Sequence, residues 1–209
     1  QKELGTLEIE FDTNIREDKT IVPIPLGALT GVPQDVIDSI EVKDGMYQVT
    51  LDYPTFGPIM DYCSVPETRK AVRSTYSKRA PQNVEVLENI IRLRDEASDL
   101  LGYATTADYE TETKMSKSAA AVAEFYEKLR PVVRKKAEKD WEELLEAKRK
   151  DTGDPNAEFY PYDFSYYYEK IKNEKYAVDS QKVQEYFPLQ GVMDGLFEIT
   201  QLLYGIEYR

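Results

Sequence analysis

The sequence predicts a mainly α-helical chain, a multi-helix array that carries one small β-hairpin near residues 40–53. Two observations lead to this fold class. Long stretches of the chain repeat apolar residues every three to four positions, which is the period of an amphipathic helix. At one place apolar and polar residues alternate next to an Asp-Gly pair, which is typical of a hairpin. With 41 % hydrophobic residues among 209, the chain can bury a sizeable core.

The first 35 residues are expected to form an N-terminal helix or strand followed by a Pro/Gly connector. Leu4, Leu7 and Phe11 are spaced like one face of a helix, which favours a helix, although Ile9 and Phe11 also fit the alternation of a short strand. Residues 20–35 contain three prolines and two glycines. Because both residue types break regular structure, we expect an extended connector with a turn there.

A short helix over residues 33–39 and the hairpin should come next. Segments 40–43 and 46–53 flank Asp44 and Gly45, and the second segment alternates apolar and polar residues. Asp and Gly both tolerate the positive φ angles of a tight hairpin turn. We expect this hairpin to be all the sheet that the chain contains.

From Pro54 onward the pattern is helical, and capping residues mark where helices begin. Ser64 and Glu67 have the spacing of a capping box, with Pro66 in the first turn. Further caps in chain order are Asn83, Thr105 or Thr106, Ser118, Asp163, Asp179 and Pro188, and Gly102 and Gly205 are stops. The expected helices cover residues 64–79, 83–101, a short stretch around Tyr109, 118–150, 163–172, a shorter one after Asp179 and 188–204.

The composition excludes several classes of function for this chain taken alone. It contains no histidine, so it cannot hold a Ser/His/Asp triad, a Cys/His pair or a histidine-ligated zinc ion. Its net charge of −12 would repel nucleic acid and anionic membranes, so we expect neither as a partner. No apolar stretch approaches the roughly 20 residues that span a bilayer.

The single cysteine and the two ends bear on the setting of the chain. Cys63 has no partner for an internal disulfide, which favours a cytoplasm-like compartment, although the localisation stays open. The chain begins at Gln1 without an initiator methionine and stops at Arg209 directly after a helix-ending pattern. We therefore expect a piece of a longer protein that is cut at both ends.

Two candidate sites have a chemical and a structural interpretation. Cys63 could be an activated nucleophile, but its apolar neighbours favour a buried structural thiol. Asp151, Asp154, Asn156 and Glu158 bring oxygen ligands into one loop, as calcium requires, but the spacing is not that of an EF-hand. A solvated turn is the favoured interpretation of that loop.

An aromatic segment, residues 159–168, is the most unusual local feature. No single helix face can bury all of its rings, and tyrosines combine an apolar ring with a polar hydroxyl. The segment could be a domain or partner interface, which is favoured, or a wall that contacts a substrate. Its seven aromatic residues are Phe159, Tyr160, Tyr162, Phe164, Tyr166, Tyr167 and Tyr168.

Acidic groups on two helices could in principle supply an acid and a base. They alternate with Arg or Lys on helices whose other face is apolar, as solvated helical surfaces do. A catalytic role is therefore disfavoured. The two groups are Asp95, Glu96 and Asp99, and Glu142, Glu143 and Glu146.

An ordered series of motifs resembles the thimet oligopeptidase and peptidyl-dipeptidase family of zinc metallopeptidases. Residues 93–103, LRDEASDLLGY, followed by Tyr109 and Lys114-Met115, resemble the family signature LR.E.A.LLGY…Y…KM. The remaining matches are YQVTLDYP at 47–54, Arg69, Arg73, Tyr76, Arg79-Ala80 and Asn83 upstream, and Tyr162-Asp163 with Tyr167-Tyr168, EYFPL at 185–189, Gly195-Leu196 and Leu203-Tyr204-Gly205 downstream. The family usually has Trp where this chain has Tyr162.

The resemblance implies that residues 36–209, hairpin included, are the helical portion of a peptidase-like domain. Family members bind zinc through an HExxH helix and a later glutamate, and the motif glutamate activates water. That helix follows the YFPL region after several dozen residues, and this chain stops before reaching it. The resemblance therefore assigns no catalytic residue and no metal ligand here, and the substrate-binding residues stay unknown.

Two functional hypotheses follow from the resemblance. The chain is either the non-catalytic portion of a zinc-dependent oligopeptidase that hydrolyses short peptides, or a catalytically dead helical module that binds peptides or a partner. The first implies zinc in the complete enzyme and none in this chain, and it implies short peptides and the missing catalytic half as partners. Under it, the apolar face of the last helix would pack on that half and cause association when left exposed.

Overall fold

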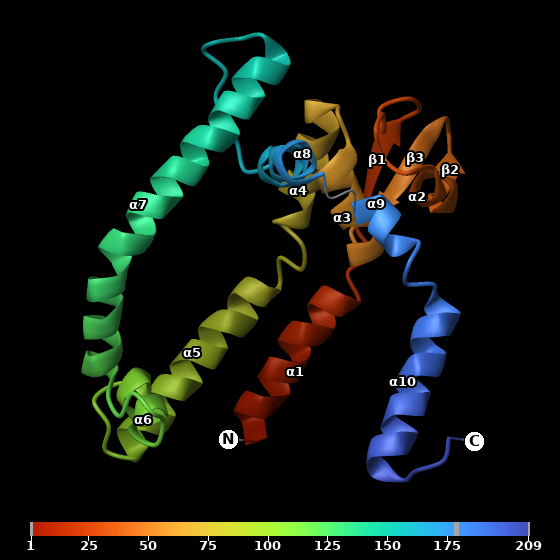
Figure 1. Cartoon of the computed structure of the whole chain (residues 1–209). Helices are drawn as coiled ribbons and strands as arrows, with labels where there is room; N and C mark the ends of the chain where they lie inside the picture. Colours follow the sequence, from red (N-terminus) through yellow and green to blue (C-terminus); the bar gives the residue numbers. More distant parts are fainter. Residues whose placement is uncertain (1, 178–179, 209) are drawn as a thin grey trace. The chain divides into compact units, whose positions relative to one another are not determined.

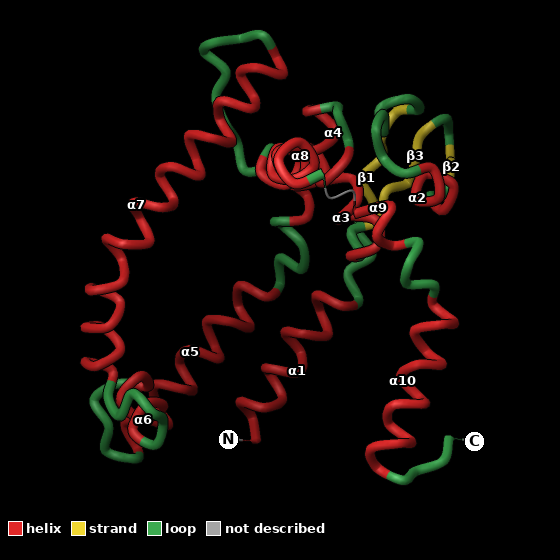
Figure 2. The backbone as a smooth tube through the Cα atoms, in the orientation of Figure 1, coloured by secondary structure: helices red, strands yellow, loops and turns green. Residues whose placement is uncertain are grey.

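The structure is a computed structural model that describes residues 2–177 and 180–208. It confirms the mainly helical fold class, and Figure 2 shows how small the share of strand is. The chain divides into two compact units, one up to Tyr167 and the other from Tyr168 onward. Among the described residues, none of the helices is long and apolar enough to cross a membrane. The domain boundary expected at residues 35–36 stays a prediction.

The described elements follow the expected order closely, and Figure 1 labels them. They are α1 (Lys2–Arg16), β1 (Ile21–Pro25), α2 (Gln34–Ser39), β2 (Val42–Lys43), β3 (Met46–Thr50), α3 (Tyr53–Tyr62), α4 (Pro66–Tyr76), α5 (Asn83–Leu100), α6 (Thr106–Glu112), α7 (Ala119–Thr152), α8 (Phe164–Tyr176), α9 (Ser180–Gln184) and α10 (Leu189–Tyr204). The helix favoured at the N-terminus is confirmed. The cap predicted at Asp179 lies outside the described residues.

Within the described part of the chain the sheet has three strands, so the expectation that the hairpin would be the whole sheet is wrong. Strands β2 and β3 form the predicted hairpin, and both Asp44 (φ 53°) and Gly45 (φ 73°) adopt the positive φ angles that its turn requires. Strand β1 comes from the expected connector and pairs antiparallel with β3, with Pro23 opposite Gln48. The order β1-β3-β2 places β1 at an edge, where a proline without an N–H is tolerated.

The core lies between this sheet and helices α2, α3 and α4 (Figure 1). Alternate residues of β1, Val22 and Ile24, are buried in this core. Helix α3 is capped by Asp52, whose side chain accepts the Thr55 N–H at 3.0 Å. Among the described residues, one cluster of buried apolar side chains forms this core: Val22, Ile24, Leu29, Val32, Ile40, Val49, Leu51, Ile59, Met60, Cys63 and Val72.

Two of the predicted helix caps are wrong because tertiary contacts use the side chains instead. Helix α4 begins one residue later than the capping box at Ser64 predicts, and the Ser64 hydroxyl donates to the Thr30 carbonyl at 3.1 Å. Asn83 does not cap α5. Its amide donates to the Phe11 carbonyl at 2.9 Å and accepts from Asn14 at 2.8 Å, which fastens α5 to α1.

Other helix ends are confirmed. Thr105 accepts the Asp108 N–H at 3.1 Å and Ser118 accepts the Ala121 N–H at 3.1 Å, so both cap as predicted. Gly205 ends α10 with a φ of 63°.

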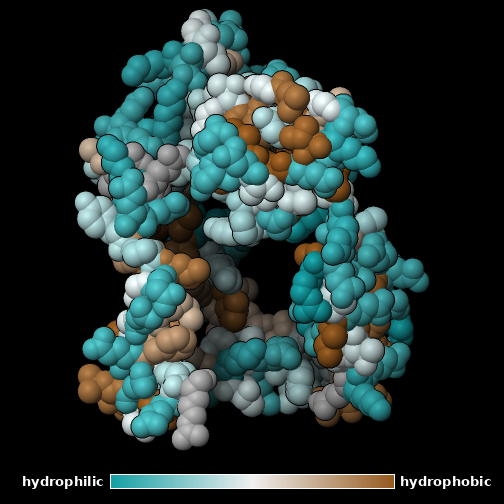
Figure 3. Space-filling model, turned by 90° about the vertical axis from the view of Figure 1, so that its right-hand side faces the viewer, coloured by the Kyte–Doolittle hydropathy of each residue, from teal (hydrophilic) through white to brown (hydrophobic). Residues whose placement is uncertain are grey.

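Apolar side chains also remain on the surface. Most residues of α7 before Trp141 are exposed, and no described residue of α10 is buried. On the face seen in Figure 3, hydrophobic side chains occur in separate groups among hydrophilic ones. Helical periodicity in the sequence therefore marks faces that the described chain itself does not cover.

Candidate functional site

A buried charge cluster fixes the aromatic segment to the rest of the first unit. Asp163, which is fully buried, directly precedes α8, as predicted. One of its carboxylate oxygens accepts a hydrogen bond from Arg69 Nη2 at 2.8 Å. The other oxygen accepts hydrogen bonds from Lys148 Nζ at 2.6 Å and from the Tyr160 N–H at 3.0 Å. Arg69 comes from α4 and Lys148 from α7, so a single carboxylate joins three segments that are distant in the sequence.

Arg69 uses its remaining donors on backbone carbonyls around the same point. Its Nε donates to the Tyr162 carbonyl at 3.1 Å, and its Nη1 donates to the Cys63 carbonyl at 2.7 Å. The guanidinium carbon lies 4.3 Å from the centre of the Tyr166 ring. Since Arg69 is only 1 % exposed, these acceptors replace the water that a buried cation loses.

The rings of the aromatic segment pack around this cluster in an ordered way. Tyr160 and Tyr162 stack with centroids 5.3 Å apart, and Lys148 Nζ lies 5.3 Å from the Tyr160 centroid. Phe159 packs edge-on against Trp141 of α7 at 4.9 Å. The cluster therefore sets the position of rings that the segment could not order by itself.

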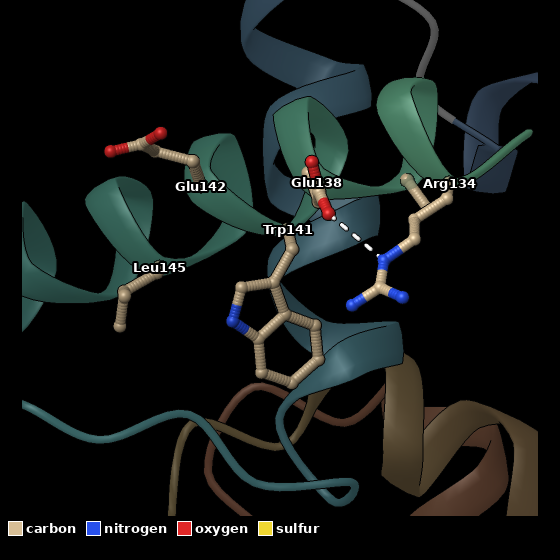
Figure 4. A pocket seen from close by; sticks show the side chains of 6 residues that line it. Arg134, Glu138, Trp141, Glu142 and Leu145 are labelled. Atoms are coloured by element: carbon tan, nitrogen blue, oxygen red, sulfur yellow. Dashed lines mark hydrogen bonds and ion pairs between the residues drawn. The ribbon is translucent and has the colours of Figure 1, made fainter. Parts of the chain in front are cut away.

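One side of this ring assembly is open to solvent. We define the aromatic surface as Trp141, Phe159, Tyr160 and Tyr162; Trp141 is 48 % exposed and Tyr160 41 %. A shallow hollow along α7 borders Trp141, and Figure 4 shows the indole beside the ion pair that joins Arg134 and Glu138. The residues that line this hollow are Arg134, Ala137, Glu138, Trp141, Glu142 and Leu145.

Tyr160 and Tyr167 are neutral hydrogen-bonding groups near pH 7. Burial, with the nearby Asp151 carboxylate, raises the pKa of Tyr167. The hydrogen bond to Glu158 raises the pKa of Tyr160. Because both shifts move away from neutrality, neither hydroxyl is suited to act as a general base, and the surface is suited to stacking and hydrogen bonding.

The structure also places the other candidates. Cys63 is fully buried, as favoured, and burial raises the pKa of its thiol, which makes it a poor nucleophile. Of the four oxygen ligands expected in one loop, Asp151 belongs to the end of α7 instead. In the loop that follows, Asp154 accepts the Asn156 N–H at 2.9 Å, which is the local bond of a turn.

The acidic groups on α5 and α7 lie mainly at the surface. All three of the first group are exposed, and Glu142 and Glu146 of the second are exposed while Glu143 is partly buried. They do not converge on one point, because no three acidic, cysteine or histidine side chains of the described residues lie close enough to hold a metal ion. The described residues therefore bring together no donor set of the kind that holds zinc, and a histidine-ligated site is excluded by composition.

Sequence reasoning missed the partners of Asp163. It placed Asp163 only as a helix cap, whereas its carboxylate bonds run backward to Tyr160 and across to Arg69 and Lys148. A weak signal was available, since Arg69 sits between Thr68 and Val72 on the face of α4 that is buried. Lys148 offered none, because it lies in a run of charged residues typical of a solvated surface.

Comparisons with known proteins agree with the motif series. The family model of Peptidase family M3 matches residues 59–209. Similar proteins include the Thimet-like oligopeptidase of Dictyostelium discoideum, 35 % identical over 96 % of this chain and 31 % of the relative. Saccharolysin of Saccharomyces cerevisiae is 31 % identical over 100 % of this chain and 31 % of the relative. Oligopeptidase A of Salmonella typhimurium is 31 % identical over 85 % of this chain and 28 % of the relative.

The chain corresponds to only part of each of these relatives. The described arrangement of a helical array, a three-stranded sheet and an aromatic segment spans about a third of the length of the relatives it matches. Within that third, the family model covers the greater part of the sequence. The chain therefore belongs to Peptidase family M3.

Proposed function

We propose that this chain is the helical, non-catalytic portion of a zinc-dependent oligopeptidase that hydrolyses short peptides. In this proposal the chain cannot catalyse without the part that carries HExxH. The absence of histidine from a chain of this family is the observation that carries it, because the family's zinc site needs two histidines. The partial coverage of every relative named above is consistent with it.

The zinc and the partners belong to the same proposal. Zinc would be bound in the complete enzyme by residues outside this chain, where it would polarise a peptide carbonyl and activate water. The partners would be short peptides and the HExxH-containing part, with no nucleic acid and no membrane. The apolar face of α10, where Val192, Leu196, Ile199 and Leu203 are between 47 % and 68 % exposed, is the surface that we expect that part to cover.

An activity assay with a quenched fluorescent peptide tests the proposal. We expect no cleavage by residues 1–209 with or without added zinc, and no stoichiometric zinc by elemental analysis. Adding the separately produced HExxH-containing part of the same protein should give zinc-dependent cleavage. Cleavage by residues 1–209 alone would refute the proposal.

A second candidate is a catalytically dead module that binds peptides or a partner. The exposed aromatic surface favours it, since stacked tyrosines and an indole offer both apolar area and hydrogen bonds. Trp141 is the only tryptophan, so its fluorescence reports binding at this surface directly. Saturable quenching by an oligopeptide that is lost in Tyr160→Ala but kept in Tyr204→Ala would support the module, and a flat titration of folded protein would exclude it.

A further inference from the structure

A second concave site lies in the first unit and shares no lining residue with the aromatic surface. It is a cavity of about 520 Å³ between the end of α1, strands β1 and β3, the start of α3 and the end of α4. This volume is within the range of small-molecule sites, about 300–1,000 Å³. Its charged lining residues are Arg16, Asp18, Lys19, Asp52 and Arg79.

The two carboxylates of this cavity are already occupied by hydrogen bonds of the fold. One oxygen of Asp18 accepts the Thr20 N–H at 2.9 Å and the other accepts the Ala80 N–H at 2.8 Å. Asp52 accepts the N–H of Thr55 at 3.0 Å and, on its other oxygen, a threonine hydroxyl. Each of the four oxygens therefore accepts a hydrogen bond within the fold, and neither carboxylate forms a salt bridge with a described cation.

Arg16 and Lys19 are exposed to solvent, whereas Arg79 is partly buried and has few acceptors. Among the described residues, Arg16, Lys19 and Arg79 form no ion pair. Arg79 Nη1 reaches only the Leu51 carbonyl, at a long 3.4 Å. Its Nε is buried and has no acceptor. A partly desolvated guanidinium with so few acceptors attracts an oxyanion strongly, because the surroundings screen its charge less than water does.

The position of Arg79 is fixed before any ligand arrives. Its guanidinium carbon lies 3.7 Å from the centre of the Tyr76 ring, which itself stacks on Phe56 at 3.9 Å. The next residue, Ala80, adopts a left-handed φ of 46°, and Asp18 holds that strained residue by its N–H. Backbone strain of this kind persists only where the surroundings enforce it, and it is common at ligand sites.

We propose that this cavity binds a small organic monocarboxylate whose carboxylate pairs with Arg79. Three cations against two occupied carboxylates leave the lining positive in a chain whose net charge is −12. The apolar part of the lining favours an organic carboxylate over inorganic phosphate, which has no apolar group to place there. Ile15, Ile21 and Leu51 line the remainder and suit a short apolar group on the ligand. This proposal does not depend on the oligopeptidase proposal.

Titrations followed by NMR test the site with defined probes. Isovalerate represents a free short-chain acid and N-acetyl-leucine represents a peptide terminus, while N-acetyl-leucinamide lacks the charge. We expect saturable shifts of the Thr20 and Ala80 amides with the two carboxylates, no saturable shift with the amide, and weaker binding of inorganic phosphate. The tighter of the two carboxylates identifies the source of the ligand, and either order supports the site.

Matched variants make the test specific. Arg79→Gln should weaken carboxylate binding at least tenfold. Arg79→Lys should bind with intermediate affinity, because lysine keeps the positive charge but lacks the two parallel N–H donors of a guanidinium. Arg92→Gln, at an exposed position of α5, should bind as the natural chain does. Equal binding by folded Arg79→Gln or Arg79→Lys, shifts reproduced by sodium chloride at the same ionic strength, or tighter phosphate binding would overturn the proposal.

Discussion

The sheet core and the outer helices use the same kinds of apolar residue but bury them very differently. Ile59 of α3 is fully buried against the sheet, whereas Ile199 of α10 is 57 % exposed. Likewise Val49 of β3 is inside the core, and Val132 of α7 lies on the surface. A stripe of apolar residues is therefore compatible with a helix or strand in either region. Whether that stripe is buried depends on whether the described chain supplies a second surface to pack on it.

The largest change in stability is expected when the carboxylate at the centre of the buried charge cluster is removed. Asp163→Ala leaves Arg69 and Lys148 without their carboxylate, so we expect a loss of about 3–5 kcal/mol in the free energy of unfolding. The matched control is Glu96→Ala, which removes an exposed pair with Arg92 and should cost roughly 0.3–0.5 kcal/mol. Urea denaturation followed by circular dichroism measures both. Similar losses in the two variants would show that burial does not distinguish these ion pairs.

A second test compares one residue type in the two regions. Ile59→Ala creates a cavity in the core and should cost about 2–5 kcal/mol. Ile199→Ala removes the same atoms from an exposed position, where substitutions change stability by less than about 0.5 kcal/mol. The measurement is again the urea midpoint and slope. If Ile199→Ala costs as much as Ile59→Ala, the face of α10 is covered in solution.

A third test uses two helix caps of the same kind. Asp52→Ala uncaps α3 in the core and should lower global stability by about 1 kcal/mol. Ser118→Ala uncaps α7, whose first half packs on little else, so the same cost of about 1 kcal/mol should appear as local fraying. Amide hydrogen exchange separates the outcomes: faster exchange confined to the start of α7 is expected for Ser118→Ala. Global acceleration would contradict the view that this half is independent.

A smaller effect concerns acid sensitivity at Asp52. Burial alone would raise the pKa of Asp52, but hydrogen bonds from Thr50 and Thr55 outweigh burial and hold that pKa below its ordinary value. A lowered folded-state pKa gives stability that is present above the unfolded pKa, near 3.9, and lost as the pH falls through the folded value. Asp52→Asn should therefore flatten the decline in stability below about pH 4. An unchanged acid limb of the stability curve would contradict this assignment.

A substitution on the exposed face of α10 should change stability least, by under about 0.5 kcal/mol, but should change the self-association of the chain. Leu196 of α10 is 52 % exposed and sits on the face that we expect a partner to cover. The natural chain should self-associate as its concentration rises, and Leu196→Glu should stay monomeric by light scattering. Glu198→Gln on the same helix is the control and should associate like the natural chain. A strictly monomeric natural chain would count against an uncovered docking face.

Local signals in the sequence predicted most elements but only part of their contacts. The Asp44-Gly45 turn and the caps at Thr105 and Ser118 were predictable because each depends on residues within a few positions. Strand β1 was hidden because its prolines indicate a connector, and only pairing with β3 makes it a strand. Asn83 is likewise a residue type that often caps helices, but in the fold its side chain donates to the Phe11 carbonyl of α1 instead.

The candidate site shows the same division. The sequence indicated an aromatic segment at 159–168 and could not order its rings, because ring order depends on Arg69 and Lys148 from two distant helices. The cavity around Arg79 left no sequence signal at all. Its lining comes from five elements, α1, β1, β3, α3 and α4, spread over more than sixty positions that only folding brings together.

The helical fold class, the hairpin, the lack of histidine and the family resemblance can all be read from the sequence, since they depend on composition, periodicity and ordered motifs. Only the folded chain shows which apolar stripes are buried, that the Asp163 carboxylate pairs with two cations, and that Arg79 Nε is buried without an acceptor. The physical reason is that hydrogen bonds within a turn or helix are short in sequence, whereas burial and charge pairing depend on surfaces that meet only after the chain has folded.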